Sequence, residues 1–371
     1  MPSDSSKPLQ RLSALGQSVW IDFLSRETNR GGHLQQLIDE SSVVGATSNP
    51  TIFQKAMAGG DAYDEQLAEL AKDGADTEES FWALAEQDIR EACDLFAPVF
   101  EATAHRDGYV SLEVDPRLAY DTLETFRAAM RLHEQVDRAN LMVKIPATRP
   151  GLAAIEDAIA KGRSINVTLI FSLERYAEVA ESYVRGLERL VAEGGNPAKV
   201  ASVASFFVSR IDTEADRRLQ EAGAPKELQG KLAIANAKLA YEHYKRVFAG
   251  PRWEFLLGKG ATPQRVLWAS TSTKNPDYPD VLYVEELIGP DTVDTMPEET
   301  IEAYQDHGEP ESRLERDLEG ARRVFEQLAQ AGVDYGDVTD TLEREGVEKF
   351  SDSFDELLAA LSEKHRSLVA A

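Results

Sequence analysis

The sequence predicts an α/β protein, a (β/α)8 barrel with extra helical insertions and a helical C-terminal tail. Eight short runs rich in β-branched and aromatic residues alternate with long amphipathic helical patterns over the 371 residues. The first run is not followed by a Gly-rich dinucleotide-binding turn, which disfavours the alternative, a doubly wound open sheet with a helical appendix. We therefore expect residues 1–371 to form a single barrel domain.

The expected strands and helices alternate along the chain. The strand-like runs cover residues 18–23, 42–48, 109–114, 141–146, 164–171, 201–208, 265–271 and 291–297. Leu, Ala, Ile and Tyr recur at helical spacing among charged residues in the segments 23–41, 118–138, 151–161, 173–193, 227–249, 281–289 and from 297 onward. Each strand is thus followed by helical sequence, as the barrel requires.

Two connections are longer than a barrel needs. They span about residues 52–108 and 209–264, and both show helical patterns, so we interpret them as helical insertions rather than separate domains. The tail, residues 311–371, also has a helical pattern. Within it, Ser353 and Glu356 have the spacing of a capping box ahead of an apolar run, which predicts that a terminal helix begins there and docks against the protein.

The chain is strongly acidic. Its 40 Lys and Arg residues against 65 Asp and Glu give a formal net charge of -25, which disfavours nucleic acid or an anionic membrane as a partner. A phosphorylated small molecule would therefore need a local basic pocket to overcome the overall negative field.

The remaining composition indicates a reducing compartment. The single cysteine, Cys93, excludes an internal disulfide framework and is interpreted as a core residue, and the six histidines show no metal-ligand spacing. The first residues, MPSDSSKPLQRL, contain no apolar signal-peptide region, and no stretch reaches the roughly 18 consecutive apolar residues of a membrane span. We expect a soluble, cytoplasmic protein.

Polar residues interrupt strand-like runs that would otherwise be apolar. Barrel strands are buried on both faces, and barrel enzymes place their chemistry at the C-terminal ends of the strands. The interrupting residues are Asp22, Thr47 to Asn49, Glu113, Lys144, Asn166, Thr168, Ser205, Ser270 and Ser272. Taken singly, each is more often a hydrogen-bonded core group than a functional one. Their recurrence in seven strands indicates a site at one end of the barrel.

Lys144 lies in the middle of the run LMVKIPAT, residues 141–148. Burying an ammonium group is costly unless the group is paired or loses its proton. One interpretation is a structural ion pair with Glu113 or Asp22, an arrangement that apolar residues often replace without loss. The other is that burial favours the neutral amine, a nucleophile that condenses with a substrate carbonyl to form a Schiff base.

Schiff-base chemistry on carbon requires further groups, and the same strands carry candidates for them. A retro-aldol step needs a base for the hydroxyl group on the carbon that is released, and Asp22 is placed for that role. Dehydration of the first adduct needs an acid, which Glu113 can provide with a water held by Thr168. The candidates for substrate binding are Asn49, Asn166 and Ser205 for hydroxyl groups, and Arg210 and Lys274 for a phosphate.

Five motifs resemble those of the transaldolase family. GATSNPTIF (45–53) resembles the second-strand signature, LMVKIPAT the Schiff-base lysine strand, and NVTLIFS (166–172) the strand that follows. SLEVDPRLAYDT (111–122) and ASFFVSRID (204–212) are similar to two further family segments. The motifs occur in the order of the family and cover the barrel from about residue 18 to about residue 275, and the length and helical tail resemble the longer bacterial branch.

The resemblance implies a TIM barrel that works in the pentose phosphate pathway without metal or cofactor. It implies transfer of a dihydroxyacetone unit from sedoheptulose 7-phosphate or fructose 6-phosphate to glyceraldehyde 3-phosphate or erythrose 4-phosphate. It assigns the Schiff base to Lys144, the main proton transfer to Asp22, and a water-mediated relay to Glu113 with Thr168. Substrate contacts are assigned to Asn49, Asn166, Ser205, Phe207 and Arg210.

One position departs from the family pattern. Where many members carry a second phosphate-binding arginine in a Ser-Phe-Arg-Asn run, this chain reads STKN, with Lys274 in register. Lysine keeps the charge but lacks the bidentate guanidinium group. We therefore expect Ser270 and Ser272 to add hydrogen bonds to the phosphate.

Two other functions are compatible with the sequence. One is another class I aldolase, such as fructose-6-phosphate aldolase, which Phe207 disfavours because Tyr is expected there. The other is a non-catalytic barrel that acts as a binding protein, which the presence of Lys144, Asp22 and Glu113 disfavours. The expected partners are small sugar phosphates, and the sequence does not distinguish a monomer from a homodimer.

Overall fold

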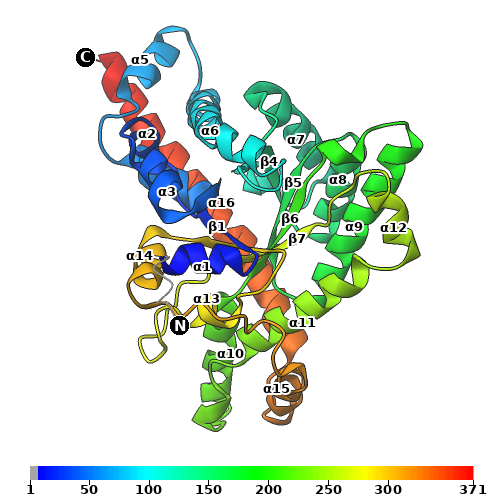
Figure 1. Ribbon diagram of the computed structural model, residues 1–371. Coiled ribbons are helices and arrows are strands. Elements are labelled where there is room, and N and C mark those ends of the chain that lie inside the picture. Colours follow the sequence, from blue (N-terminus) through cyan, green and yellow to red (C-terminus); the bar gives the residue numbers. More distant parts are fainter. Residues whose placement is uncertain (1–6, 371) are drawn as a thin grey trace.

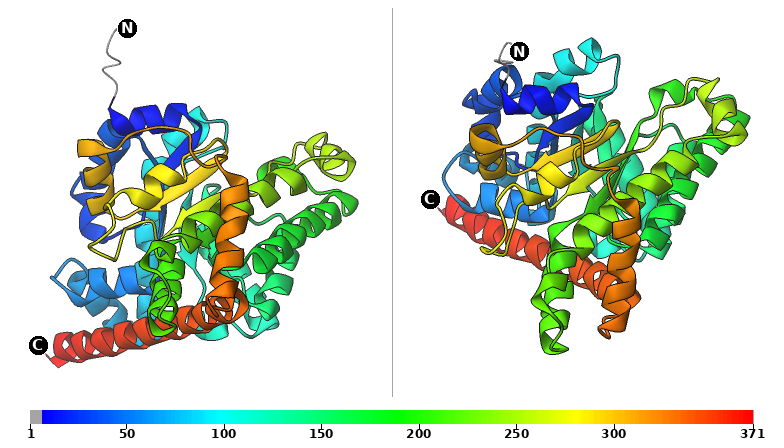
Figure 2. Two further views of the ribbon diagram at one scale, coloured as in Figure 1. Left: turned by 90° about the horizontal axis from the view of Figure 1, so that it is seen from below. Right: turned by 60° about the horizontal axis from the view of Figure 1, so that its bottom comes forward.

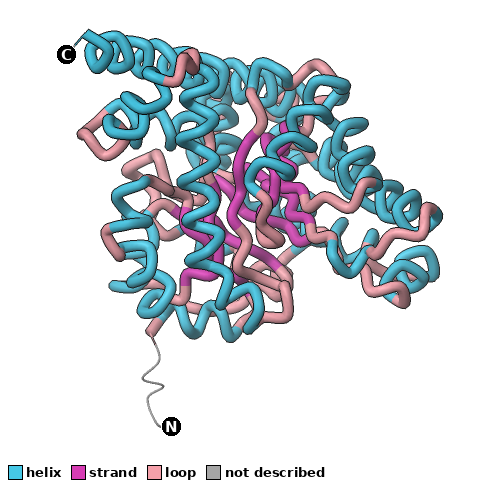
Figure 3. The backbone as a smooth tube through the Cα atoms, turned by 90° about the horizontal axis from the view of Figure 1, so that it is seen from above, coloured by secondary structure: helices cyan, strands magenta, loops and turns pink. Residues whose placement is uncertain are grey.

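Eight parallel strands close into a barrel at the centre of the molecule. The computed structural model describes residues 7–370. The strands are β1 (Gln17–Ile21), β2 (Val43–Thr47), β3 (Val110–Glu113), β4 (Leu141–Pro146), β5 (Ile165–Ile170), β6 (Ser202–Phe207), β7 (Arg265–Ala269) and β8 (Thr292–Met296). Each strand pairs with the next along the chain, and β1 pairs with β8 to complete the closed order. Figure 3 shows the strands in magenta, surrounded by helices.

Helices connect the strands and cover the outside of the barrel (Figure 1). Up to β5 they are α1 (Pro8–Ala14), α2 (Arg26–Arg30), α3 (His33–Ser41), α4 (Pro50–Ala58), α5 (Asp64–Lys72), α6 (Thr77–Ala102), the 3-10 turn η1 (Pro116–Leu118), α7 (Thr122–Val136) and α8 (Arg149–Ala160). After β5 they are α9 (Leu173–Ala192), η2 (Pro197–Lys199), α10 (Ser209–Glu221), η3 (Lys226–Leu228), α11 (Leu232–Val247), α12 (Pro251–Leu257), α13 (Leu282–Glu286), α14 (Glu298–His307), α15 (Leu318–Gln330) and α16 (Tyr335–Ala370).

The predicted fold class is confirmed, and all eight predicted strands are present with ends shifted by at most two residues. The two long connections are helical as expected: α4, α5 and α6 lie between β2 and β3, and α10, α11 and α12 lie between β6 and β7. The alternation of apolar strands with amphipathic helices, together with the absence of a Gly-rich dinucleotide turn, thus predicted the barrel.

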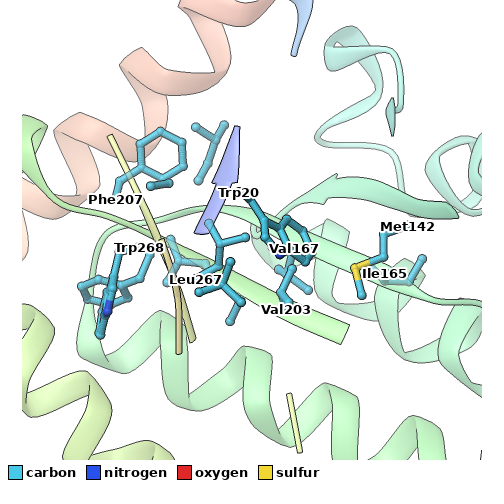
Figure 4. Packing of buried hydrophobic residues seen from close by; sticks show 14 of the residues in the cluster. Trp20, Met142, Ile165, Val167, Val203, Phe207, Leu267 and Trp268 are labelled. Atoms are coloured by element: carbon cyan, nitrogen blue, oxygen red, sulfur yellow. The ribbon is translucent and has the colours of Figure 1, made fainter. Parts of the chain in front are cut away.

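Buried apolar side chains fill the barrel and the layer between strands and helices. Trp20, Val203 and Leu267 are at most 1% exposed, and Figure 4 shows them among the side chains packed around the strands. Gly45 allows β2 to approach the indole ring of Trp20, because a Cβ atom at this position would lie 2.5 Å from the ring. A larger residue at position 45 would displace the tryptophan from the core.

One prediction about the tail is wrong: Ser353 and Glu356 do not cap a helix. They lie inside α16, which is continuous over 36 residues. Amide groups inside a helix bond to the carbonyl groups of the preceding turn, so there is no free amide for a capping side chain at Ser353. The Ser353 hydroxyl lies instead 2.9 Å from the hydroxyl of Thr51 on α4 and ties the two helices together.

The expectation that the tail docks on the protein is confirmed. Helix α16 packs against α4, α5, α6 and α10, all of which follow barrel strands or belong to the long connections. Figure 2 shows it as the long orange-red helix on one side of the molecule, with α1 on the opposite side. Over residues 7–370, no helix is both long and apolar enough to cross a membrane.

Candidate active site

A cavity of about 790 Å³ opens between the C-terminal ends of the strands and helix α16. Most of the predicted site residues line it: Asp22, Asn49, Lys144, Thr168, Ser205, Phe207, Arg210, Ser270, Ser272 and Lys274. Glu113 and Asn166 do not line the cavity, and both are buried beneath it. The structure therefore brings together side chains that are separated by more than two hundred residues in the sequence.

Strand register places three of these residues in one row. Glu113 on β3 is the direct partner of Lys144 on β4, and Lys144 is the direct partner of Asn166 on β5. Side chains at paired positions of parallel strands point to the same face of the sheet. The row therefore points into the barrel, with Lys144 at its centre.

The amine of Lys144 is held by two oxygen atoms. Its Nζ lies 3.0 Å from Oε2 of Glu113 and donates a hydrogen bond of 2.9 Å to the carbonyl of Ser48. The two side chains of the ion pair are 6% and 2% exposed, so water screens their attraction little. The ion pair with Glu113 is compatible with both interpretations of Lys144, the structural ion pair and the Schiff-base nucleophile. Only the second interpretation explains why Lys144 lies on the cavity wall.

Glu113 is a buried carboxylate with limited hydrogen bonding. Burial raises the pKa of Glu113, while the charge of Lys144 and its hydrogen bond act in the opposite direction. Its second oxygen, Oε1, is buried without a hydrogen-bond partner among residues 7–370. Burial therefore favours the protonated form of the Glu113 carboxyl group, and the neighbouring ammonium favours its ionised form.

Asp22 directly follows β1 and faces the same cavity. Its Oδ1 accepts a hydrogen bond of 2.6 Å from the hydroxyl of Thr47, which in turn lies 2.7 Å from the hydroxyl of Thr295. Burial raises the pKa of Asp22, and the Thr47 hydrogen bond and the charge of Lys144 oppose this rise. Asp22 is thus oriented by two neighbouring strands and has the character of a proton acceptor.

A small hydrogen-bond network holds the floor of the cavity. The Asn166 side chain donates to Oγ of Ser111 at 3.0 Å and accepts from Oγ of Ser205 at 2.7 Å. Both the nitrogen and the oxygen of the Asn166 carboxamide are therefore hydrogen-bonded, and Asn166 fixes the orientation of the Ser205 hydroxyl. The Oγ1 atom of Thr168, by contrast, is buried without a partner among residues 7–370 and is free to bind a ligand.

The backbone beside Thr168 is irregular. The pairing of β5 with β6 shifts register between Val167 and Ile170, and Leu169 has a φ of 59°. A branched side chain in the left-handed region is strained and persists only where the surroundings hold it. The irregularity lies directly beside Thr168, which lines the cavity.

Asn49 has a structural role as well as a place on the cavity wall. It is the N-cap of α4, and its Oδ1 accepts a hydrogen bond of 3.0 Å from the backbone amide of Ile52. This leaves the Nδ2 group of Asn49 available to a ligand. The position accordingly needs the carboxamide for folding and for any contact with substrate.

Cationic and hydroxyl groups gather on another wall of the cavity. The Arg210 guanidinium lies 5.1 Å from the ring centre of Phe207, and burial lowers its pKa. Ser270 lies 2.9 Å, hydroxyl to hydroxyl, from Ser209, and the Lys274 amine donates to Oγ of Ser272 at 2.7 Å. This wall has the chemistry of an anion site in an otherwise acidic protein.

The sequence did not identify the contribution of the tail to the cavity. Helix α16 lines it with Leu342, Glu345, Gly346, Lys349 and Phe350. The ring of Phe350 is centred 6.0 Å from Nζ of Lys144 and 5.9 Å from the guanidinium carbon of Arg210. The amphipathic pattern of the tail showed that one face is buried, but no local signal shows that this face covers an active site.

Gly346 sets the distance between α16 and the barrel. A Cβ atom at this position would lie 3.1 Å from Leu169 and 3.5 Å from Phe171. We expect Gly346→Leu to displace the helix and Phe350 with it, and to raise KM for fructose 6-phosphate about tenfold, since small misplacements of positioning groups are costly. Steady-state kinetics and thermal unfolding measure both effects.

The matched control for this change is Gly336→Leu in the first turn of α16. Gly336 is exposed, and a Cβ atom there would meet only the side chain of Asp334. Its kinetics are expected to equal those of the unmodified protein. A Gly346→Leu variant with unchanged KM would show that the position of α16 does not affect the site.

The chain is similar to known proteins over nearly its whole length. The family model described as Transaldolase/Fructose-6-phosphate aldolase matches residues 19–361. A protein named transaldolase from Parafrankia sp. (strain EAN1pec) is 54% identical over 362 residues, which cover 97% of this chain and 98% of that protein. Proteins of the same name from Acidothermus cellulolyticus (strain ATCC 43068 / DSM 8971 / 11B) and Mycobacterium leprae (strain Br4923) are 52% and 50% identical, each over 96% of both chains. The chain therefore belongs to the transaldolase/fructose-6-phosphate aldolase family.

Proposed function

We propose that this protein transfers a dihydroxyacetone unit from a ketose phosphate to an aldose phosphate through a Schiff base on Lys144. The observation that carries the proposal is the buried Lys144 amine, 3.0 Å from Glu113, on the wall of a cavity that Asp22 also lines. Transaldolase activity is supported by the relatives that bear this name, which match 96–97% of the chain. The donors expected are sedoheptulose 7-phosphate and fructose 6-phosphate, and the acceptors are glyceraldehyde 3-phosphate and erythrose 4-phosphate.

The first step is formation of the Schiff base. Glu113 takes a proton from the Lys144 ammonium, and the neutral amine attacks the carbonyl carbon of the ketose. The carbinolamine hydroxyl then leaves as water after it receives a proton, which Glu113 supplies through a water bound to Thr168. Burial raises the pKa of Glu113, which favours its protonated form and so its role as a proton donor, while the charge of Lys144 favours the ionised form that accepts a proton.

Bond cleavage follows at the iminium. Asp22 accepts the proton of the hydroxyl group on C4, the bond between C3 and C4 breaks, and its electron pair moves to the iminium nitrogen to form an enamine. The shortened aldose phosphate leaves. The enamine carbon then attacks the carbonyl of the acceptor aldose, Asp22 returns the proton to the new hydroxyl group, and hydrolysis frees the Lys144 amine.

The decisive experiment is covalent trapping. Borohydride reduces the iminium formed with fructose 6-phosphate to a stable secondary amine. Mass spectrometry of the digested protein is expected to find this adduct on Lys144. An unmodified Lys144, or an adduct on a different lysine, would contradict the proposal.

Fructose-6-phosphate aldolase activity is the second candidate, because the matching family model covers both enzymes. An aldolase releases free dihydroxyacetone by hydrolysis, whereas a transferase retains the unit until an acceptor aldehyde arrives. Phe207 on the cavity wall disfavours the aldolase, where Tyr is expected. Rapid release of dihydroxyacetone from fructose 6-phosphate without an acceptor would favour the aldolase.

Arg210 is proposed to bind the substrate phosphate. We expect Arg210→Ala to raise KM for fructose 6-phosphate by about tenfold or more, because a charge-assisted hydrogen bond to phosphate is lost. Saturation with free dihydroxyacetone, which has no phosphate, is expected to change little.

The control for Arg210 is Arg246→Ala, an exposed arginine in the last turn of α11. It removes the same charge from the protein without touching the cavity wall. Equal losses with phosphorylated and unphosphorylated ligands in Arg210→Ala would place the phosphate elsewhere.

Several expectations from the sequence and from the family resemblance stay predictions. These are the cytoplasmic location, the lack of nucleic-acid and membrane partners, the independence from metal and cofactor, and the assignment of barrel, insertions and tail to one domain. The choice between monomer and homodimer is open to measurement by sedimentation.

A further inference from the structure

We propose that Lys349, on the C-terminal helix α16, binds the substrate phosphate together with Arg210 and Lys274, and so contributes to the preference for phosphorylated sugars. This inference rests on the proposed function and adds a residue to its phosphate site. The family motifs end before the tail, so neither the sequence motifs nor the assigned roles include Lys349.

Besides Lys144, four cations from four different segments line the cavity. Lys55 lies on α4, Arg210 on α10, Lys274 in the segment after β7, and Lys349 on α16. In a chain with a formal net charge of -25, such a convergence of positive groups around one cavity is opposite to the overall field. It indicates a site for an anion.

These cations lack carboxylate partners within residues 7–370, unlike many others in the protein. On the same helix, Lys364 pairs with Asp64 at 3.1 Å. Lys274 bonds only to the neutral hydroxyl of Ser272, and no ion pair joins Lys349 to an acidic side chain in the described part of the chain. A long charged side chain at a cavity wall that has no ionic partner of its own is available to a ligand.

The carboxylates on the cavity wall do not neutralise the cluster. Glu214 accepts hydrogen bonds from Arg217 at 2.7 Å and Arg218 at 2.6 Å, and Glu298 lies 2.6 Å from His33. Glu299 and Glu345 are exposed to solvent, which screens their charge. The remaining carboxylate on the wall, Asp22, is buried, and its charge acts on Arg210 and Lys274 without forming an ion pair with either. The four cations therefore have no directly paired carboxylate in the described part of the chain.

Mutual repulsion within the cluster lowers the pKa of Lys349. The charge of Arg210 lowers the pKa of Lys349 more than burial does, and Lys274 and Lys55 lower it further. Like charges held together in this way destabilise the free protein locally. Binding of a phosphate dianion neutralises these charges and removes that repulsion. Relief of the repulsion therefore adds to the free energy of binding of the phosphorylated ligand.

The neighbouring residue fixes where Lys349 acts. The ring centre of Phe350 lies 5.9 Å from the guanidinium carbon of Arg210 and 6.0 Å from the Lys144 amine, so this turn of α16 lies near both the reacting group and the cation proposed to bind phosphate. The close approach of Gly346 to Leu169, 3.1 Å from a built Cβ atom, holds the turn in that place. Lys349 precedes Phe350 on this turn and lines the same cavity as Arg210 and Lys274.

The test compares Lys349→Met, which keeps the length of the side chain and removes its charge, with the unmodified enzyme. Inhibition by inorganic phosphate is expected to weaken about tenfold, and KM for glyceraldehyde 3-phosphate to rise by a similar factor, as for the loss of one charged contact. KM for unphosphorylated glyceraldehyde is expected to stay unchanged. Lys349→Arg, which restores the charge, should recover most of the phosphate affinity.

The matched control is Arg344→Ala, an exposed cation on the same helix that does not line the cavity. It should leave phosphate inhibition unchanged. Unaltered inhibition in Lys349→Met, or an equal loss in Arg344→Ala, would overturn the inference. Because the borohydride adduct with dihydroxyacetone needs no phosphate, its formation on Lys144 in the same variant separates a failure of this inference from a failure of the proposed function.

Discussion

Replacing Lys144 with arginine is expected to abolish both the borohydride adduct and turnover. Arginine keeps a positive charge beside Glu113, but it does not lose its proton in proteins and cannot attack a carbonyl. Turnover should fall by at least about 10³-fold, as for removal of a covalent nucleophile. Trapping with fructose 6-phosphate followed by mass spectrometry measures the first effect, and a coupled assay of product formation the second.

The protein offers a close control for this experiment in Lys238. Lys238 is also buried, 8% exposed, and its amine also lies 3.1 Å from a glutamate, Glu286, but it does not line the cavity. Lys238→Arg tests whether exchanging a buried, paired lysine is harmful in itself. Retained turnover in Lys144→Arg, or its loss in both variants, would refute the role of Lys144 as nucleophile.

The barrel was predictable because its information is local. The run 141–146 is apolar except for Lys144, and it forms β4 at the same residues, Leu141–Pro146, since a strand covered on both faces needs such a sequence. Alternation of strands and helices is also compatible with an open doubly wound sheet, and eight strands without a Gly-rich dinucleotide turn favoured the closed barrel. The cap predicted at Ser353 failed because the Ser-x-x-Glu spacing also occurs inside helices, and only the preceding turn decides whether free amides exist there.

The site was predictable to the extent that its residues lie on strands. Alternation of side chains put Lys144, Thr168 and Ser205 on the inward face, and the closed barrel brought them to one cavity. The register of Glu113 with Lys144 was not readable from the sequence, because strand pairing is a tertiary property. Lys349 and Phe350 lie in an ordinary amphipathic helix. The face that meets the cavity is decided by docking on barrel residues far away in the sequence, such as Leu169 beside Gly346.

Replacing Asp22 with asparagine is also expected to have a large effect on turnover, at the step in which the carbon–carbon bond breaks. In the unmodified protein the Thr47 hydroxyl donates a hydrogen bond of 2.6 Å to Asp22. In Asp22→Asn the carboxamide keeps the shape of the side chain and an oxygen that can accept this bond, but it cannot accept the proton of the C4 hydroxyl group. The Schiff base on Lys144 should still form, while cleavage of the C3–C4 bond falls by about 10²- to 10⁴-fold, the usual contribution of a general base. The uncleaved donor is therefore expected to accumulate as a reducible adduct, detectable by its full sugar phosphate mass on Lys144.

The pH dependence of turnover distinguishes this role from simple disruption. Because burial raises the pKa of Asp22, its carboxyl is protonated, and inactive as a base, up to a higher pH than an ordinary aspartate. The acid side of the kcat/KM profile should lie correspondingly high and be absent in Asp22→Asn. Asp294→Asn is the control: burial raises the pKa of Asp294 to about 8, so the group is largely neutral at pH 7 and the amide should replace it without loss of turnover. If Asp22→Asn fails to form the adduct while Asp294→Asn behaves as expected, then Asp22 acts in assembly of the Schiff base and not in cleavage of the carbon bond.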